Sequence, residues 1–366
     1  MNVLLLYGGK SCEHDVSIVT AKQVLANVEE NIFEIYVTKN GEWRLIEGLE
    51  KPRDFACEQK VERMKKVCIL PGQKSLYIKK GKKLKKLCDA DVALLCFHGV
   101  NGEDGSVQGV LQLSDIPYTS CGICASSVAM DKSIAKLFLK GIGAPVVDGL
   151  TFFKEQSINE ILAATEQIVG YPAIIKPSNL GSSIGISVSK NRRELLNSLE
   201  VAFSFDQKVL VEKALQNFED ANISVMKKDG QILTSLIEKP IVWHDFLSFD
   251  DKYKTGAKGM ADSKRIFPFD HPQKEKIDFW AREIYKKLDC KGVVRIDFLT
   301  GRDGEVYVNE INTIPGSFAY YLWEGSFDFK QLLKIQIEQA INSQKQREKL
   351  TFLYETDLLK YKYSKK

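Results

Sequence analysis

Several residue patterns that mark other classes of protein are scarce or missing in this sequence of 366 residues. It has only 4 histidines, far apart in the chain, which argues against a metal site built from histidine. No apolar run approaches the ~18 residues that a membrane span needs, and the short apolar run near the N-terminus follows no basic leader. We therefore expect a cytoplasmic protein with reduced thiols and no membrane partner. The net charge of +4 is too small to predict a nucleic-acid partner.

Two clusters of a single residue type have simple structural interpretations. Cys121 and Cys124 form a C-x-x-C pair, but no second pair and no nearby histidine completes a zinc set. We predict buried, inert thiols, with a redox or metal-binding role as the alternative. The lysine-rich stretch 79–86 is interpreted as a solvated hairpin with a charged edge, with a site for an anionic partner as the alternative.

The distribution of apolar residues predicts three domains. Strands at 3–7, 34–38 and 91–97 and a helix at 16–28 indicate a parallel α/β sheet in the first domain, residues 1–125. The second domain, residues 126–217, is expected to open on a helix around Met130-Asp131-Lys132. The third is expected to cover residues 218–366. The expected strands of the second and third domains are 173–177, 207–213, 221–227, 232–238, 293–299 and 305–311, and a charged helical tail is expected from about residue 327.

The first candidate site lies on the last two predicted strands. Arg295 and Asp297 alternate along one strand, so their side chains share a face, and Glu310 and Asn312 do the same on the next. Two carboxylates and an amide oxygen suit Mg²⁺ bound together with nucleotide phosphates. The guanidinium is able to neutralise charge that develops in a reaction. A hairpin with ordinary surface ion pairs is the alternative.

A second candidate site combines Lys132, Lys176 and the loop 178–185, which is rich in glycine and serine. Backbone N–H groups of such a loop bind phosphate oxygens, and lysines add positive charge. The loop is not a Walker A motif, because no Gly-Lys-Ser/Thr follows at the required spacing. A plain turn is the alternative.

A third candidate site follows the first predicted strand, where Gly8-Gly9 precedes Glu13 and His14. Glu13 is able to bind the ammonium group of an amino acid. The alternative is a carboxylate placed at a helix N-terminus because the helix dipole favours it there.

Seven segments, in this order along the chain, resemble the D-alanine–D-alanine ligase family of the ATP-grasp superfamily. They are Gly8–Ser17, His98–Gly109, Met130–Lys136, Ile175–Gly185, Val211–Leu215, Asp251–Tyr253 and Glu310–Gly316. The resemblance implies an α/β (α+β) ATP-grasp fold with an N-terminal parallel-sheet domain. It also implies ATP as cosubstrate, two Mg²⁺ ions that Mn²⁺ is able to replace, amino-acid substrates and a homodimer. The implied reaction forms an acyl phosphate, which the amine of a second amino acid then attacks, in the synthesis of peptidoglycan precursors.

The resemblance also implies residue roles. Glu13 would bind the first amino acid's ammonium group, and Ser182 and Tyr253 would join it in a hydrogen-bonded set. Arg295 and the Gly316 N–H would stabilise the tetrahedral oxyanion. Asp297, Glu310 and Asn312 would bind the metal ions. The residues that would bind ATP are Lys132, Lys176, Ser183, Glu212, Lys213, Ala214, Leu215, Glu219 and Lys252.

Two segments depart from the family pattern. The serine that helps to bind the second substrate's carboxylate in the family is replaced by Tyr321, in the run Ser317–Glu324. The Tyr-Asp-Tyr run of the family becomes Leu247–Asp251, with fewer hydroxyl groups. A lost or moved hydrogen-bonding group changes substrate preference strongly, so the second substrate stays open among D-alanine, D-serine, another amino acid and a hydroxy acid.

Overall fold

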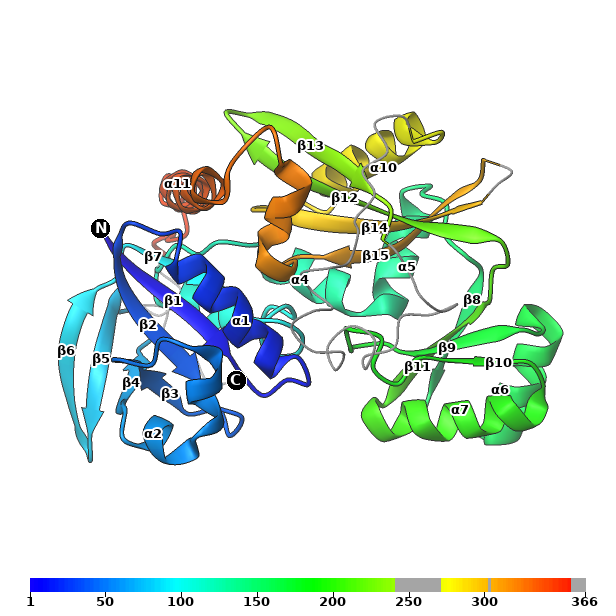
Figure 1. Cartoon of the computed structure of the whole chain (residues 1–366), viewed down its shortest axis with the longest axis horizontal. Helices are drawn as coiled ribbons and strands as arrows, with labels where there is room; N and C mark the ends of the chain where they lie inside the picture. The colour runs from blue at the N-terminus through cyan, green and yellow to red at the C-terminus, as the bar shows by residue number, and fades with distance from the viewer. Residues whose placement is uncertain (241–270, 302–303, 357–366) are drawn as a thin grey trace, which may run out of the picture.

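The computed structural model describes residues 1–240, 271–301 and 304–356, and its strands form three sheets (Figure 1). The first sheet has seven strands in the order β6-β5-β4-β3-β2-β1-β7. The bounds of these strands are β1 Asn2–Gly8, β2 Asn31–Val37, β3 Trp43–Leu45, β4 Lys65–Ile69, β5 Ser75–Lys80, β6 Lys83–Asp89 and β7 Val92–Leu95. The predicted parallel pairing is confirmed for β2, β1 and β7, and the other four strands extend the sheet in antiparallel pairs.

The lysine-rich stretch is confirmed as a hairpin at a sheet edge. It forms β5, the turn and β6, which is the outermost strand. Residues 79–86 are all exposed to solvent. A charged edge of this kind discourages pairing with a strand of another molecule.

Alternation along β1 sends its side chains into two different cores. Val3, Leu5 and Tyr7 pack with α1 (His14–Leu25) and α11 (Phe329–Arg347). Leu4 and Leu6 pack on the other face with α3 (Ser106–Leu113). Because both faces are covered, the strand is apolar throughout, as the sequence indicates. Two short helices, η1 (Pro52–Ala56) and α2 (Glu58–Glu62), complete this part of the chain.

The second and third sheets have four strands each, in the orders β10-β9-β11-β8 and β13-β12-β14-β15. The strands of the second sheet are β8 Gly149–Phe153, β9 Ala173–Pro177, β10 Ser187–Ser189 and β11 Lys208–Lys213. Those of the third are β12 Phe218–Lys228, β13 Gln231–Glu238, β14 Val294–Gly301 and β15 Val306–Asn312. All six strands predicted for the second and third domains are therefore present, and β8 and β10 were not predicted.

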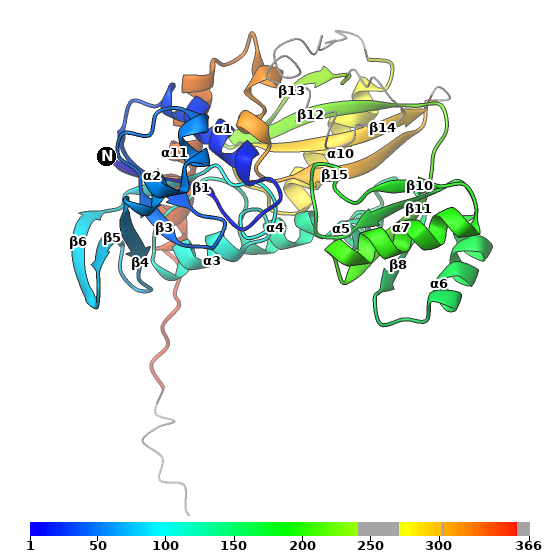
Figure 2. The ribbon, with the colours of Figure 1, turned by 60° about the horizontal axis from the view of Figure 1, so that its bottom comes forward.

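Helices cover one face of each of these two sheets. The second sheet packs on α6 (Ile158–Ala164), the π-helical turn η2 (Thr165–Val169) and α7 (Arg192–Phe205). The third packs on α10 (Lys274–Lys287) and α4 (Ile123–Met130). On β14 buried and partly exposed residues alternate strictly, so Arg295 and Asp297 lie on the face away from this core, whereas Thr300 is buried on the core side. Figure 2 shows the three sheets grouped around α4 and α5 (Lys132–Gly141).

Three details differ from the predictions. Asp131 does not lie inside a helix, because its extended backbone separates α4 from α5 and its carboxylate caps α5 by accepting hydrogen bonds from the N–H groups of Ser133 and Ile134. The helical tail ends at Arg347, and residues 351–356 have no regular structure. The predicted boundary at residue 125 falls within α4, so the exact domain limits stay a prediction. Within the described residues, no helix combines the length and apolar character needed to cross a bilayer.

Candidate active site

The patch on β14 and β15 has the geometry that the alternation predicts. Arg295 pairs with Asn312 in the strand register, and Asp297 pairs with Glu310. Arg295 donates from Nε to Asp297 Oδ1 at 2.7 Å and from Nη2 to Oδ2 at 2.8 Å. Asn312 Nδ2 donates to Asp297 Oδ2 at 3.0 Å. Four polar side chains from two neighbouring strands thus form one connected cluster.

Arg295 keeps its positive charge in this cluster, because the raised pKa of its guanidinium favours the protonated form. Burial by itself would lower the pKa of the guanidinium, but the Asp297 carboxylate and then Tyr321 and Glu238 raise this pKa above its usual value. A permanently charged donor next to the carboxylates, with 21% of its side chain exposed, is suited to stabilising a developing negative charge.

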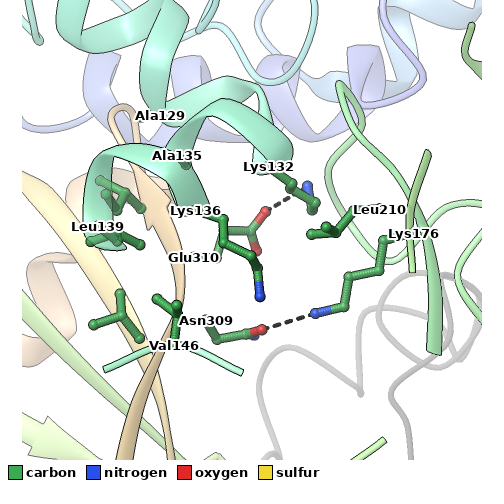
Figure 3. A pocket seen from close by; sticks show the side chains of 12 residues that line it. Ala129, Lys132, Ala135, Lys136, Leu139, Val146, Lys176, Leu210, Asn309 and Glu310 are labelled. Carbon is green, nitrogen blue, oxygen red and sulfur yellow. Dashed lines mark hydrogen bonds and ion pairs between the residues drawn. The ribbon is translucent and has the colours of Figure 1, made fainter. Parts of the chain in front are cut away.

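A pocket opens between the second and third sheets, beside this cluster (Figure 3). Its apolar part is formed by Ala129, Ala135, Leu139, Val146, Leu210, Val308 and Ile311. Its polar part contains Lys132, Lys136, Lys176, Asn309 and Glu310. An apolar surface next to three ammonium groups suits a ligand with an aromatic base and a polyanionic end.

The lysines of the pocket connect three different elements. Lys132 Nζ, on α5, lies 3.0 Å from Glu310 Oε1 on β15, and it also donates to the carbonyl of Leu180. Lys176 Nζ, on β9, donates to Asn309 Oδ1 on β15 at 3.1 Å. The structure therefore brings Lys132, Lys176 and Glu310 to one pocket, although the sequence separates them by up to 178 residues (310 − 132).

The segment 212–215 lies at the end of β11, next to this pocket. Glu212 is buried and forms ion pairs with both Lys136 and Lys176. Ala214 is buried, and its N–H donates to the Pro172 carbonyl at 2.9 Å. Glu219, on β12, pairs with Lys239 at 2.7 Å.

The loop 178–185 contacts the third candidate site. The Ser182 hydroxyl donates to Glu13 Oε1, and Glu13 is only 9% exposed. Glu13 also lies closely against two glycines, because a Cβ on Gly181 would lie 2.5 Å from its Oε2 and a Cβ on Gly99 would lie 2.8 Å from it. The loop thus meets the N-terminal region at Glu13, and only residues without a side chain fit there.

His98, which is buried, and Glu103, which is partly buried, have contacts that the sequence did not reveal. Glu103 accepts hydrogen bonds from the N–H of Gly99 at 2.8 Å and from the N–H of Ile314 at 3.1 Å. Burial raises the pKa of Glu103 to about 8, with the Glu13 carboxylate as the second cause. His98 lies 2.9 Å from the Thr20 hydroxyl, and burial lowers its pKa to about 4. Both residues lie in His98–Gly109, one of the seven segments that carry the family resemblance. That resemblance is the feature of the sequence that points to them.

The segment after Gly316 has an unusual backbone. In the helical turn η3 (Gly316–Trp323), Ser317, Phe318 and Ala319 all have left-handed φ values, of 50°, 54° and 49°. This conformation costs non-glycine residues roughly 1–2 kcal/mol each, so other contacts must hold it. Trp323 Nε1 donates to the Ser224 hydroxyl at 3.1 Å, and that hydroxyl donates to the Val294 carbonyl at 3.2 Å. These bonds attach the turn to the strand that carries Arg295.

The C-x-x-C pair was predicted to have two buried thiols. Cys121 is buried as predicted, but Cys124 is exposed, so the prediction of two buried thiols is wrong for Cys124 because it lies on the outer side of α4. Lys252 and Tyr253, and the departure at 247–251, lie outside the described residues.

Comparison with known proteins assigns the chain to a family. Residues 2–121 match the family model "D-ala D-ala ligase N-terminus", and residues 138–338 match "D-ala D-ala ligase C-terminus". A protein named D-alanine–D-alanine ligase from Thermosipho africanus is 40% identical over 377 aligned positions, which cover 100% of both chains.

Solved structures agree with this assignment. The D-alanine–D-alanine ligase of Coxiella burnetii superimposes with a TM-score of 0.78 at 25% identity, over 95% of this chain and 96% of that one. The VanG D-Ala:D-Ser ligase of Enterococcus faecalis superimposes with a TM-score of 0.77 at 27% identity, over 93% and 99%. The predicted ATP-grasp architecture is thereby confirmed, and the chain belongs to the D-alanine–D-alanine ligase family.

Proposed function

We propose that this chain uses ATP to join two D-alanine molecules through an acyl phosphate, and so supplies a dipeptide for peptidoglycan precursors. The observation that carries the proposal is the cluster of Arg295, Asp297, Glu310 and Asn312 at the edge of the lysine-lined pocket. This cluster supplies oxygen ligands and a fixed positive charge beside a pocket suited to a nucleotide. Full-length relatives that are named D-alanine–D-alanine ligase support the same reaction.

The positions of the side chains suit the two chemical steps. The carboxylate of the first amino acid attacks the γ-phosphorus of ATP, and its ammonium group would bind Glu13. Lys132 and Lys176 would neutralise the phosphate oxygens at the pocket. When the second amine attacks the carbonyl carbon and phosphate leaves, Arg295 and the N–H of Gly316 would stabilise the oxyanion. Catalysis of this type depends on positioning and charge neutralisation.

The oxygen donors fit the magnesium ions that the family resemblance implies. Asp297 and Glu310 lie opposite each other in the strand register, and Asn312 adjoins Asp297. Hard oxygen donors of this kind are typical ligands of Mg²⁺ shared with nucleotide phosphates, and Mn²⁺ accepts the same donors. A bound ion would reduce the negative charge on the transferred phosphoryl group.

A second candidate function is the ligation of D-alanine to a different second amino acid, such as D-serine. The favouring observation is Tyr321, which stands where the family has a serine, in a turn with three left-handed residues. The structural likeness to the VanG D-Ala:D-Ser ligase is equally good, with a TM-score of 0.77.

The deciding experiment measures ATP-dependent phosphate release with pairs of D- and L-amino acids and with D-lactate. We expect release with D-alanine alone, loss of this release on chelation with EDTA, and recovery with Mg²⁺ or Mn²⁺. Release that requires D-alanine together with D-serine would support the second candidate. Phosphate release with no amino-acid pair would contradict both.

The resemblance further supports a homodimer that works in the cytoplasm and has domains at 1–125, 126–217 and 218–366. Exposed leucines on two helices, Leu113 at 67% and Leu137 at 66%, give apolar surface that a dimer is able to bury. Light scattering of the purified protein tests the dimer, and limited proteolysis tests the domain limits.

A further inference from the structure

The carboxylate of Glu212 is neutralised twice. Its Oε1 forms an ion pair with Lys136 Nζ, and its Oε2 forms one with Lys176 Nζ. All three side chains are nearly inaccessible, at 7% for Glu212, 11% for Lys136 and 10% for Lys176. Burial would raise the pKa of Glu212, but Lys176 and Lys136 bring it below its usual value. One carboxylate thus has two counter-ions, although a single ammonium group balances its charge.

The two lysines differ in their other partners. Lys136 also lines the pocket, but its partners, Glu212 and the Val147 carbonyl that it donates to, are not lining residues, and Val147 lies in the chain that leads to β8. Lys176 instead donates across the pocket to Asn309 on β15, at 3.1 Å (Figure 3). A nucleotide that enters the pocket would come between the second and third sheets. It would displace the contact between Lys176 and Asn309 and leave the contact between Lys136 and Val147 in place.

Lys176 leaves the carboxylate of Glu212 at an electrostatic cost, which depends on whether another cation remains beside that carboxylate. Removing the partner of a buried ion pair is strongly unfavourable when the remaining charge is left uncompensated. Lys176 is therefore able to leave Glu212 for a phosphate group only if another cation stays with the carboxylate. Among the described residues, Lys136 is the side chain that forms an ion pair with Glu212 besides Lys176.

We propose that Lys136 is the permanent counter-ion of Glu212 and that it frees Lys176 to move from this carboxylate to the phosphates of the nucleotide. Lys136 is then a positioning residue, which acts on phosphate binding through Glu212 and Lys176. The inference rests on the proposed function, because it takes the pocket to be the ATP site. Neither periodicity nor the family resemblance assigned a role to Lys136.

The test is a calorimetric comparison of ADP with adenosine in the whole enzyme with Mg²⁺ and without amino acids. In Lys136→Met, Lys176 stays with Glu212, so ADP should bind on the order of 10- to 100-fold more weakly, as for one lost charge-assisted hydrogen bond. Adenosine, which has no phosphate, should keep its affinity within about twofold. The matched control is Lys140→Met, one turn further along α5, where the lysine pairs with Asp148 at the surface at 3.0 Å. This control should bind both ligands normally.

A double-mutant cycle separates the proposed mechanism from direct contact. Lys176→Met should weaken ADP as Lys136→Met does, and the double variant should be no weaker than either single variant within about twofold. Losses that multiply would overturn the proposal, because Lys136 would then bind the phosphates itself. An ADP affinity that is unchanged in Lys136→Met would overturn it as well.

A suppressor gives a second, independent test. In Lys136→Met combined with Glu212→Gln, no carboxylate retains Lys176, so the ratio of ADP to adenosine affinity should return to that of Glu212→Gln alone. A ratio that stays low would contradict the proposal, and this neutral pair also serves if Lys136→Met alone fails to fold. If the unmodified enzyme binds no ADP, the proposed function fails instead of this inference.

Discussion

Arg295 donates two hydrogen bonds, of 2.7 and 2.8 Å, to Asp297, which lies two residues further along the same strand. The pair fixes the guanidinium in one orientation and fixes the carboxylate for a metal ion. A residue proposed as an electrostatic catalyst and a residue proposed as a metal ligand therefore share their positioning. The alternation of the strand places both side chains on its partly exposed face, opposite the buried Ile296 and Phe298.

We expect Arg295→Ala to fold but to ligate ~10²–10³-fold more slowly, because it loses the donor that we propose stabilises the developing oxyanion. ADP release in a coupled assay measures this effect, and circular dichroism checks the fold. The control is Arg192→Ala, since Arg192 forms a surface pair with Glu166 at 2.6 Å and is not one of the residues that line the pocket. Near-normal turnover of Arg295→Ala would remove Arg295 from the mechanism.

The sequence predicts those parts of the fold that depend on local patterns. The strand predicted at 173–177 matches β9 in both bounds, because a short apolar run ends at a proline. Arg295 and Asp297 share a face because side chains alternate along any strand. These predictions needed no knowledge of distant contacts.

Long-range contacts and backbone strain could not be predicted in the same way. Glu103 accepts a hydrogen bond from Ile314, 211 residues away, and no local pattern reports such a pairing. The left-handed turn at Ser317, Phe318 and Ala319 has no glycine to signal it. The role of Lys136 depends on two partners from other elements, so it became visible only in the assembled pocket.

The raised pKa of Glu103 predicts a pH dependence of stability. The folded protein retains this proton up to pH about 8, whereas the unfolded chain loses it near the ordinary glutamate pKa of 4.5. The free energy of unfolding should therefore fall as the pH rises from 4.5 to about 8, and the fall should level off above that pH. His14, His98 and His271, whose pKa values burial lowers from 6.5, also contribute near pH 6.5, so the effect of Glu103 is isolated by comparison with Glu103→Gln, in which these histidines are the same.

Urea unfolding at pH 6.5 and pH 8.5 measures this dependence. Glu103→Gln has no proton to lose, so its stability should change less between the two pH values than that of the unmodified protein. It should also be less stable at pH 6.5, because one amide oxygen cannot replace both acceptors for Gly99 and Ile314. An equal pH dependence in both proteins would show that Glu103 is ionised in the folded state.

The close approach of Gly181 to Glu13 predicts a large effect of one methyl group. In Gly181→Ala the new Cβ would lie 2.5 Å from Glu13 Oε2, so the carboxylate or the loop must move. A displacement near 1 Å in a substrate-positioning residue is able to reduce kcat/KM by on the order of 10²-fold. Steady-state kinetics against the first amino acid measures the effect.

Gly109 offers a matched control for this substitution. It lies in α3, and a Cβ there meets nothing within 4 Å. Gly109→Ala should keep full activity and should stabilise the protein by roughly 0.5–1 kcal/mol, because alanine favours the helix. Normal kinetics in Gly181→Ala would show that the contact between Gly181 and Glu13 is not maintained in the working enzyme.

The neighbouring tyrosines of η3 allow a test of the second-substrate site. Tyr321 lies near Arg295, whose pKa it helps to raise, whereas Tyr320 stacks on Phe329 with ring centroids 4.6 Å apart. If the Tyr321 hydroxyl replaces the family's serine at the second carboxylate, Tyr321→Phe should raise the KM for the second amino acid by about 10- to 100-fold, as expected for a hydrogen bond to a charged group. The KM for the first amino acid should not change, since its ammonium group is proposed to bind Glu13 and not Tyr321. Tyr320→Phe, which removes the same atom one residue earlier, should leave both constants unchanged. Equal effects of the two substitutions would place the second carboxylate elsewhere and would leave Tyr321 with a structural role in the left-handed turn.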